Sequence, residues 1–379
     1  MGEWREVKIG DITNLYQGLA INKKTNYLLV EKSTLPLLRI KDLQENTEEF
    51  FINDKEAPKK CIANEDDLIF TRTGIVGMVF MGKKGVVHNN CFRIVPKNDE
   101  VYLPFYYHYF NRESIRDYLT NISAGSVQPD MNHTIFKTVK VPFPPLKEQK
   151  AIAEVLSSLD DKIDLLHRQN KTLEEMAQTL FRQWFIEEAK DEWEVGKLPD
   201  EFDFTMGLSP KGETFNEEGI GTPMYQGNAD FEFKFPKNRV YTTDPKRYAE
   251  KFDTLISVRA PVGAQNMAKE KCCIGRGVAS FRYKDDNSFY TYTYFKMMSL
   301  MNEIKQFNNS GTVFGSINKT DFQEMDIVIP PKELVMKFQK EVKPLDDKVI
   351  QNTFQIKTLE NIRDTLLPKL MSVEVRVKL

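Results

Sequence analysis

Two stretches of the chain carry apolar residues at alternating steps of four and three, which is the heptad pattern of a helix that packs against a second helix. The first seam runs through Ile152, Leu156, Leu159, Ile163, Leu166, Asn170, Leu173, Ala177, Leu180 and Trp184. The second runs through Phe338, Val342, Leu345, Val349, Asn352, Ile356, Leu359, Arg363, Leu366 and Leu370. Each seam would extend about 50 Å at a rise of 1.5 Å per residue. The pattern predicts one long helix in residues 146–188 and another in residues 332–371.

Each seam holds one asparagine near its middle, and this sets the expected register of the two helices. A buried asparagine opposite Ile or Leu would lose hydrogen bonds at a cost on the order of 1–3 kcal/mol. Antiparallel packing with Asn170 against Asn352 avoids that cost. The predicted coiled-coil core is then Leu159, Ile163, Leu166, Asn170, Leu173, Leu345, Val349, Asn352, Ile356 and Leu359. The alternative is that each helix packs only on its own globular domain.

The chain repeats itself. Residues 123–149 (SAGSVQPDMNHTIFKTVKVPFPPLKEQ) align without a gap with residues 309–335 (NSGTVFGSINKTDFQEMDIVIPPKELV). The aligned pairs include Gly125 with Gly311, Phe136 with Phe322, and the Leu-Asp-Asp-Lys runs at 159–162 and 345–348. Further upstream, DDLIFTRTGIVG (66–77) resembles FDTLISVRAPVG (252–263) with one residue inserted, and LPLLRIKDL (35–43) falls on TPMYQGNADF (222–231). A constant interval through such runs indicates a duplication.

Each copy mixes alternating strand patterns with helical stretches such as FYYHYFNRESIRDYLTNI (105–122), which predicts an α+β class with mixed sheets. The expected division is a first globular domain at 1–145, a long helix at 146–188, a second globular domain at 189–331 and a long helix at 332–371. The tail, 372–379, repeats the apolar-polar alternation of the N-terminus. We therefore expect a strand there that completes the first domain and makes the organisation cyclic.

Composition narrows the class of protein. At 379 residues and 41% hydrophobic, the chain can bury two cores. The four cysteines form no C-x-x-C pair, and four histidines are too few for a zinc pattern, so we expect reduced structural thiols and no metal. Neither an apolar leader nor a stretch of about 20 apolar residues is found, which predicts a cytoplasmic protein. The formal charge of −2 does not by itself indicate DNA binding.

The sequence offers no catalytic residues. An amino-methyltransferase needs an Asn/Asp-Pro-Pro-aromatic motif and a Gly-rich cofactor loop, whereas the Pro-Pro pairs here follow Phe143 and Ile329. GMVFMGKK (77–84) approaches a P-loop but lacks the terminal Ser/Thr. Adjacent positions on a helix point about 100° apart, so Asp160-Asp161 and Asp346-Asp347 are interpreted as solvated charges or partner contacts. We expect a protein that is not an enzyme.

Several of these segments are similar to a known family. VPFPPLKEQKAIAEVLSSLDDKIDLLHRQNKTLEEMAQTLF (141–181), LENIRDTLLPKLMSVEVRV (359–377), the duplication and the QGNADF run (226–231) resemble the specificity subunits of type I restriction-modification systems. The second copy departs from the pattern, with PPKELVMKF where P-P-L-x-E-Q would stand. The resemblance extends over essentially the whole chain.

The resemblance implies a non-catalytic subunit that binds double-stranded DNA and chooses the sequence through two target recognition domains. It implies two methyltransferase subunits and, for cleavage, motor-nuclease subunits as partners. Adenine methylation and cleavage would be carried out by these partners. S-adenosylmethionine, ATP and Mg²⁺ would bind to them, and this chain would hold no cofactor.

Base readout needs donors and acceptors on short rigid loops, with Arg for guanine, Asn or Gln for adenine, and Lys or backbone N–H groups nearby for phosphate. The candidate DNA-binding residues are Arg39, Lys41, Arg72, Thr73, Ser126, Gln128, Gln226, Asn228, Arg259, Thr312 and Ser316. Arg72 and Arg259 end matching strands before matching glycines, so we interpret them as equivalent. A salt bridge is the alternative role for either arginine.

Two readers joined by a stiff helical rod would recognise two short half-sites separated by an unread spacer. Two alternatives stay open from the sequence. The chain could be the specificity subunit of another class of restriction-methylation enzyme. It could also be a coiled-coil interaction protein without DNA binding, for which a near-neutral charge would be expected.

Overall fold

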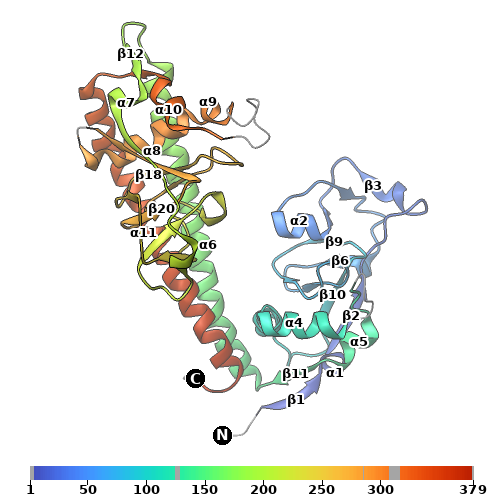
Figure 1. Cartoon of the computed structure of the whole chain (residues 1–379). Helices are drawn as coiled ribbons and strands as arrows, with labels where there is room; N and C mark the ends of the chain where they lie inside the picture. Colours follow the sequence, from blue (N-terminus) through green and yellow to red (C-terminus); the bar gives the residue numbers. More distant parts are fainter. Residues whose placement is uncertain (1–3, 124–128, 285, 307–315, 378–379) are drawn as a thin grey trace. The chain divides into compact units, whose positions relative to one another are not determined.

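The computed structural model describes residues 4–123, 129–284, 286–306 and 316–377 (Figure 1). The chain divides into two compact units, one of residues 1–163 with 359–379 and one of residues 164–358. Two long helices, α6 (Leu146–Arg182) and α11 (Lys332–Met371), each contribute a segment to both units. Every unit therefore combines a globular domain with a pair of helical segments.

The first unit is built on small sheets. Its antiparallel sheet has the order β2-β10-β7-β8, from β2 (Thr13–Gln17), β10 (Cys91–Pro96), β7 (Leu68–Thr71) and β8 (Val79–Phe80). A mixed sheet follows the order β4-β9-β6, from β4 (Leu37–Leu38), β9 (Gly85–Val87) and β6 (Ile62–Ala63). Two strand pairs are β1 (Arg5–Lys8) with β11 (Lys140–Phe143) and β3 (Leu29–Val30) with β5 (Phe51–Ile52). The shorter helices are α1 (Ile9–Ile12), α2 (Ile40–Glu45), α3 (Leu103–Phe110), α4 (Glu113–Ile122) and α5 (His133–Thr138).

The second unit repeats this plan with a larger mixed sheet. Its antiparallel sheet has the order β13-β21-β18-β19, from β13 (Phe202–Met206), β21 (Val278–Tyr283), β18 (Thr254–Ser257) and β19 (Gln265–Met267). The mixed sheet is β14-β16-β15-β20-β17, from β14 (Phe215–Asn216), β16 (Val240–Thr242), β15 (Thr222–Tyr225), β20 (Cys272–Ile274) and β17 (Tyr248–Ala249). The strands β12 (Glu194–Lys197) and β22 (Asp326–Ile329) form a pair. The shorter helices are α7 (Leu198–Glu201), α8 (Tyr290–Ser299), α9 (Met301–Gln306) and α10 (Lys319–Glu324).

The strand pairing confirms the duplication and the α+β class with mixed sheets. In the first unit β10 lies between β2 and β7, and in the second β21 lies between β13 and β18, antiparallel in every case. The parallel strand pair of the mixed sheet also recurs, with Leu37 beside Val86 and Met224 beside Cys273. The two copies therefore share one backbone frame, although their sequences differ.

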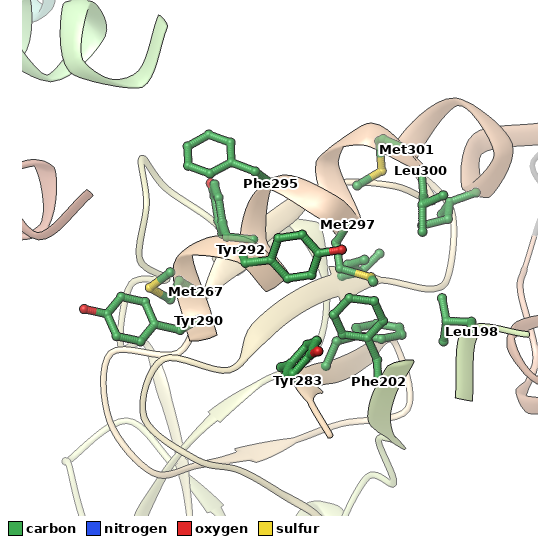
Figure 2. Packing of buried hydrophobic residues seen from close by; sticks show 14 of the residues in the cluster. Leu198, Phe202, Met267, Tyr283, Tyr290, Tyr292, Phe295, Met297, Leu300 and Met301 are labelled. Atoms are coloured by element: carbon green, nitrogen blue, oxygen red, sulfur yellow. The ribbon is translucent and has the colours of Figure 1, made fainter. Parts of the chain in front are cut away.

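Each globular domain packs directly on the long helices of its own unit. In the first unit Phe70, Phe92 and Phe136 form an aromatic cluster that is continuous with Ile152 of α6 and Leu370 of α11. The second core gathers aromatic and methionine side chains from β13, β19, β21 and α8; Figure 2 labels Leu198, Phe202, Met267, Tyr283, Tyr290, Tyr292, Phe295, Met297, Leu300 and Met301. Burial of these large side chains is the main stabilising contribution, since each contributes about 1.5–3 kcal/mol.

The helices α6 and α11 lie side by side and antiparallel, as predicted (green and red in Figure 1). In the first unit Arg363 Nη1 donates to Asp160 Oδ1 at 2.9 Å. In the second unit Asn170 Nδ2 donates to Thr353 Oγ1 and Asn352 Nδ2 donates to Gln169 Oε1, both at 3.4 Å. These contacts agree with the predicted register.

The two asparagines do not bond to each other, contrary to the prediction. Each is buried and donates instead to the side chain beside the other, because a hydroxyl and an amide oxygen lie within reach there. Their Oδ1 atoms have no partner within the described chain. Of the other predicted core residues, four are buried and four half-buried: the former are Ile163, Leu166, Val349 and Ile356, and the latter Leu159, Leu173, Leu345 and Leu359.

The interpretation of Asp346 as a solvated charge or a partner contact is wrong. Its side chain is 1% exposed, and its Oδ1 lies 2.5 Å from the Nζ of Lys234, whose side chain is fully buried. Thr291 of α8 donates to the other carboxylate oxygen at 2.9 Å, and Glu174 of α6 lies 3.8 Å from Lys234. The loop that carries Lys234 covers this face of α11, which the heptad pattern alone could not show.

The ammonium of Lys234 also lies 3.7 Å from the centre of the Tyr294 ring. Burial alone would lower the pKa of Lys234, but the charges of Asp346 and Glu174 raise it above its ordinary value. The lysine is therefore charged in the fold and compensates two acidic groups on the two long helices. This cluster of Lys234, Asp346, Glu174, Thr291 and Tyr294 ties the second globular domain to both helices, and we call it the buried ion cluster.

The C-terminal tail contains no strand in residues 372–377, which corrects the sequence prediction. Its backbone caps the end of α11 instead: Ser372 N donates to Pro368 O at 3.0 Å and Val375 N to Lys369 O at 3.1 Å. Val373 takes the left-handed conformation (φ 66°) that such a helix end requires. Val377 then packs on the first core, so the tail belongs to the first unit.

Within the described residues, none of the helices combines the length and the apolar character needed to cross a bilayer.

Replacing Lys234 by Met should destabilise the second unit by about 3–5 kcal/mol, because it leaves two buried carboxylates without their cation. The measurement is thermal or urea unfolding of the full chain. Lys211→Met is the matched control, since Lys211 forms an exposed pair with Glu213 at 3.8 Å and should change stability little. Equal effects of the two substitutions would contradict this account of the buried ion cluster.

Candidate nucleic-acid interface

In the second unit, several strand ends meet at one edge of the mixed sheet. Because β15 and β20 are parallel, the residues that follow them lie together, and Gly275 N donates to Tyr225 O at 2.8 Å. The end of β18 joins them, since Val258 N donates to Gly277 O at 2.9 Å. We call the segments 226–228, 258–259 and 275–277 the second edge.

The same arrangement is found in the first unit. His88 N donates to Leu38 O at 3.1 Å, and Arg72 N donates to Asn90 O at 2.9 Å. The segments 39–41, 72–73 and 88–90 therefore form a first edge on the equivalent strands. Short loops on a rigid sheet are suited to base readout, because the sheet fixes where each side chain begins.

Arg72 is held by neighbouring side chains at the first edge. Its guanidinium makes a two-pronged ion pair with Asp130, with Nε 2.9 Å from Oδ1 and Nη2 2.6 Å from Oδ2. Its Nη1 also donates to Gln17 Oε1 at 3.0 Å. The salt bridge that the sequence left open as an alternative is thus present. Arg72 links the ends of β2 and β7 to the chain segment just before α5.

Arg39 and Lys41 are also paired with acidic groups. Arg39 contacts Asp42 at 2.6 Å and Glu49 at 2.5 Å, and Lys41 contacts Glu49 at 2.7 Å. The hydrogen bonds from Lys41 and Arg39 lower the pKa of Glu49 to about 2. The positive charge of this part of the first edge is therefore largely neutralised within the protein.

The predicted equivalence of Arg72 and Arg259 is wrong by one residue. Met131 N donates to Arg72 O, and in the second unit Ile317 N donates to Val258 O, at 2.9 and 3.1 Å. The buried Val258 therefore occupies the position of Arg72. Arg259 corresponds to Thr73, as their bridges to Ser316 and Asp130 confirm. The one-residue insertion assumed in the upstream alignment caused the error.

The other candidates fall into two groups. Gln226, Asn228, Arg259 and Ser316 are exposed at or beside the second edge, and Thr73 is half-buried at the first. The alignment of Arg39 and Lys41 with Gln226 and Asn228 agrees with the strand ladders. Three candidates, Ser126, Gln128 and Thr312, lie outside the described residues.

Sequence reasoning missed two exposed arginines that the structure brings to the second edge. Arg276 follows β20, and Arg247 precedes β17, with its carbonyl accepting from Ile274 N at 2.9 Å. The Gly-Arg-Gly run at 275–277 was a signal for the first, because glycines on both sides of one arginine permit a tight turn. Arg247 had no such signal.

Within the described ranges, no group of three or more His, Cys, Asp or Glu side chains is placed to hold a metal ion. Burial raises the pKa of the Cys91 thiol to about 12, so this cysteine is a poor ligand and nucleophile at neutral pH.

Comparison with known proteins gives the class. The family model described as "Type I restriction modification DNA specificity domain" matches residues 1–175 and 190–361. The MjaX specificity subunit of Methanocaldococcus jannaschii is 33% identical over 74% of this chain and 69% of its own length. The type I restriction enzyme MjaIX specificity subunit of the same organism is 28% identical over 99% of this chain and 94% of its own.

Among solved structures, the S subunit of a type I restriction-modification system from M. genitalium matches with a TM-score of 0.71. It is 20% identical, and the match covers 97% of this chain and 96% of that one. At this identity the match supports the fold alone.

The duplicated fold and the family model together define a DNA specificity subunit. This chain belongs to the specificity subunits of type I restriction-modification enzymes. As such it is a non-catalytic component of a larger complex and carries no cofactor of its own. The family predicted from the sequence is confirmed, and the rival of a coiled-coil protein unrelated to DNA is excluded.

Replacing Arg72 by Met should lower the stability of the first unit by about 1.5–3 kcal/mol, because Asp130 and Gln17 lose a partly buried charged partner. The effect would appear in urea unfolding of the full chain. Arg168→Met is the control, because Arg168 pairs with Asp164 on an exposed helix face. An Arg72→Met variant as stable as wild type would show that Arg72 does not brace the first edge.

Proposed function

We propose that this subunit reads a bipartite, asymmetric DNA target and directs adenine methylation and cleavage by its partner subunits. The observation that carries the proposal is that the two edges share one backbone frame but display different side chains. Arg39 and Lys41 at the first edge correspond to Gln226 and Asn228 at the second. Different hydrogen-bonding groups on one frame select different bases, so the half-sites should differ.

We assign residues 1–145 and 189–331 as the two target recognition domains. Their proposed DNA contacts are Arg39, Lys41, Arg72, Thr73, Ser126, Gln128, Gln226, Asn228, Arg259, Thr312 and Ser316. Because Arg72 is engaged by Asp130, we expect it to hold the first edge in place and to contact DNA only from that position. Arg39 and Lys41 are likewise engaged by Asp42 and Glu49, whereas the exposed Gln226, Asn228, Arg259 and Ser316 can reach base edges or phosphates.

The long helices supply a spacer in this proposal. With 37 and 40 residues, α6 and α11 would extend about 55–60 Å at 1.5 Å per residue. A continuous helix is stiff, so the unread gap between the half-sites should have one fixed length.

The partners follow from the family. We expect two methyltransferase subunits, which bind S-adenosylmethionine, and motor-nuclease subunits, which use ATP and Mg²⁺. Since the formal charge of this chain is only −2, the partners should also provide many of the phosphate contacts. DNA as the substrate favours the cytoplasm as the place of action.

The test is modification mapping. The chain is expressed with its methyltransferase partner, and methylated adenines are read across genomic DNA by single-molecule sequencing. The expected motif has two unequal parts with a gap of fixed length. A continuous motif, or no sequence preference from a partner shown to be active, would contradict the proposal.

A further inference from the structure

We infer that Arg276 determines specificity in the second recognition domain by reading a guanine in its half-site. The inference rests on the proposed function and adds one residue and one base to it. Arg276 is exposed at the tip of the turn that follows β20. Four observations support it: an anchored backbone, a close packing of glycines, unpaired charge and a contrast with the first edge.

The backbone around Arg276 is fixed on both sides. Val278 N donates to Gly275 O at 3.0 Å and closes the turn, and Gly275 N donates to Tyr225 O at 2.8 Å. The amide of Arg276 itself donates to Ser209 Oγ at 3.1 Å. Two neighbouring strands and one serine therefore hold the position from which the guanidinium extends. Such a fixed base reduces the entropy lost when the side chain binds.

The glycines let this turn approach the adjacent strand end. A Cβ atom at Gly277 would lie 2.1 Å from the carbonyl oxygen of Gln226, which is impossible without movement of the backbone. A Cβ at Gly275 would lie 3.3 Å from Gln226. Arg276 is consequently set beside Gln226, one of the predicted DNA contacts.

The charges at this edge are not compensated within the described chain. No ion pair is formed there by Arg247, Arg259 or Arg276, all of which are exposed. Other arginines of the same domain do have partners: Arg239 contacts Asp230 and Arg282 contacts Asp253, both at 2.5 Å. Exposed arginines without an ion-pair partner in the described chain are available to an anionic ligand, and DNA is such a ligand.

The first edge has a different chemistry at the same place. Asn89 occupies the position of Arg276 in the turn closed by Cys91 N and His88 O at 2.9 Å. The basic residues Arg39 and Arg72 of that edge are engaged by carboxylates. A free guanidinium favours guanine, because its two N–H groups match the O6 and N7 acceptors, whereas an amide favours adenine.

Arg276 is a better candidate for a base contact than the other two arginines. Its amide and both flanking residues are anchored, whereas Arg247 only leads into the edge strand β17. We expect Arg247 and Arg259 to contact phosphates, because a phosphate contact tolerates a less exact placement of the side chain.

The test uses the full chain in complex with its methyltransferase subunits and compares Arg276→Lys with wild type by modification mapping. Lysine keeps the charge but loses the two-pronged geometry. We expect the preference for guanine at one position of one half-site to fall by about 5- to 150-fold. The other half-site and the gap should not change. Arg276→Gln should shift the same position towards adenine.

The matched control is Arg182→Lys, because Arg182 lies at the end of α6, away from the second edge, and pairs with Glu187 at 3.0 Å. This substitution should leave the motif intact. If Arg276→Lys retains the full guanine preference, the inference is wrong. It is also wrong if Arg276→Gln weakens methylation equally at all sequences with a shallower salt dependence, because that result identifies a phosphate contact. Failure of the wild-type complex to give a split motif would instead reject the proposed function.

Discussion

An aspartate paired with a cation connects each long helix to its surroundings, buried in the second unit and half-buried in the first. Asp346 of α11 faces Lys234 in the second unit, and Asp160, its equivalent in α6, faces Arg363 in the first. Removing a charge from water costs several kcal/mol, which is recovered only when the partner is held at short distance. The partners come from different places, a loop of the recognition domain in one unit and the opposite helix in the other. The two copies therefore share the aspartate but differ in the basic residue that pairs with it.

The two edges likewise share one feature and differ in another. Backbone hydrogen bonds from His88 to Leu38 and from Gly275 to Tyr225 repeat one frame, while the side chains on it have changed. Arginines of the first edge are neutralised internally, and those of the second are exposed without a partner in the described chain. Two independent DNA readers require a constant backbone frame with variable surface side chains, because substitutions can then alter the bases selected without disrupting the fold.

Much of this could be predicted from the sequence, for physical reasons. Periodicity determines which helix faces are apolar, so α6, α11 and their register could be predicted. The internal repeat predicted a common backbone frame for the two domains. The partners in the ion pairs could not be predicted from the sequence. Nothing local in the sequence brings Lys234 to Asp346 or Asp130 to Arg72, because these contacts join distant segments. Arg259 was misplaced because the alignment assumed an inserted residue that the backbone hydrogen bonds do not support. The tail alternates like a strand although it caps a helix.

The central claim is that each unit reads its own half of the target. The most direct measurement is an exchange of residues 1–145 for the matching domain of another specificity subunit, followed by modification mapping of the hybrid complex. The account predicts that one half of the motif changes to that of the donor, while the other half and the gap length stay as they were. A change in both halves, or in neither, would contradict the independence of the two readers.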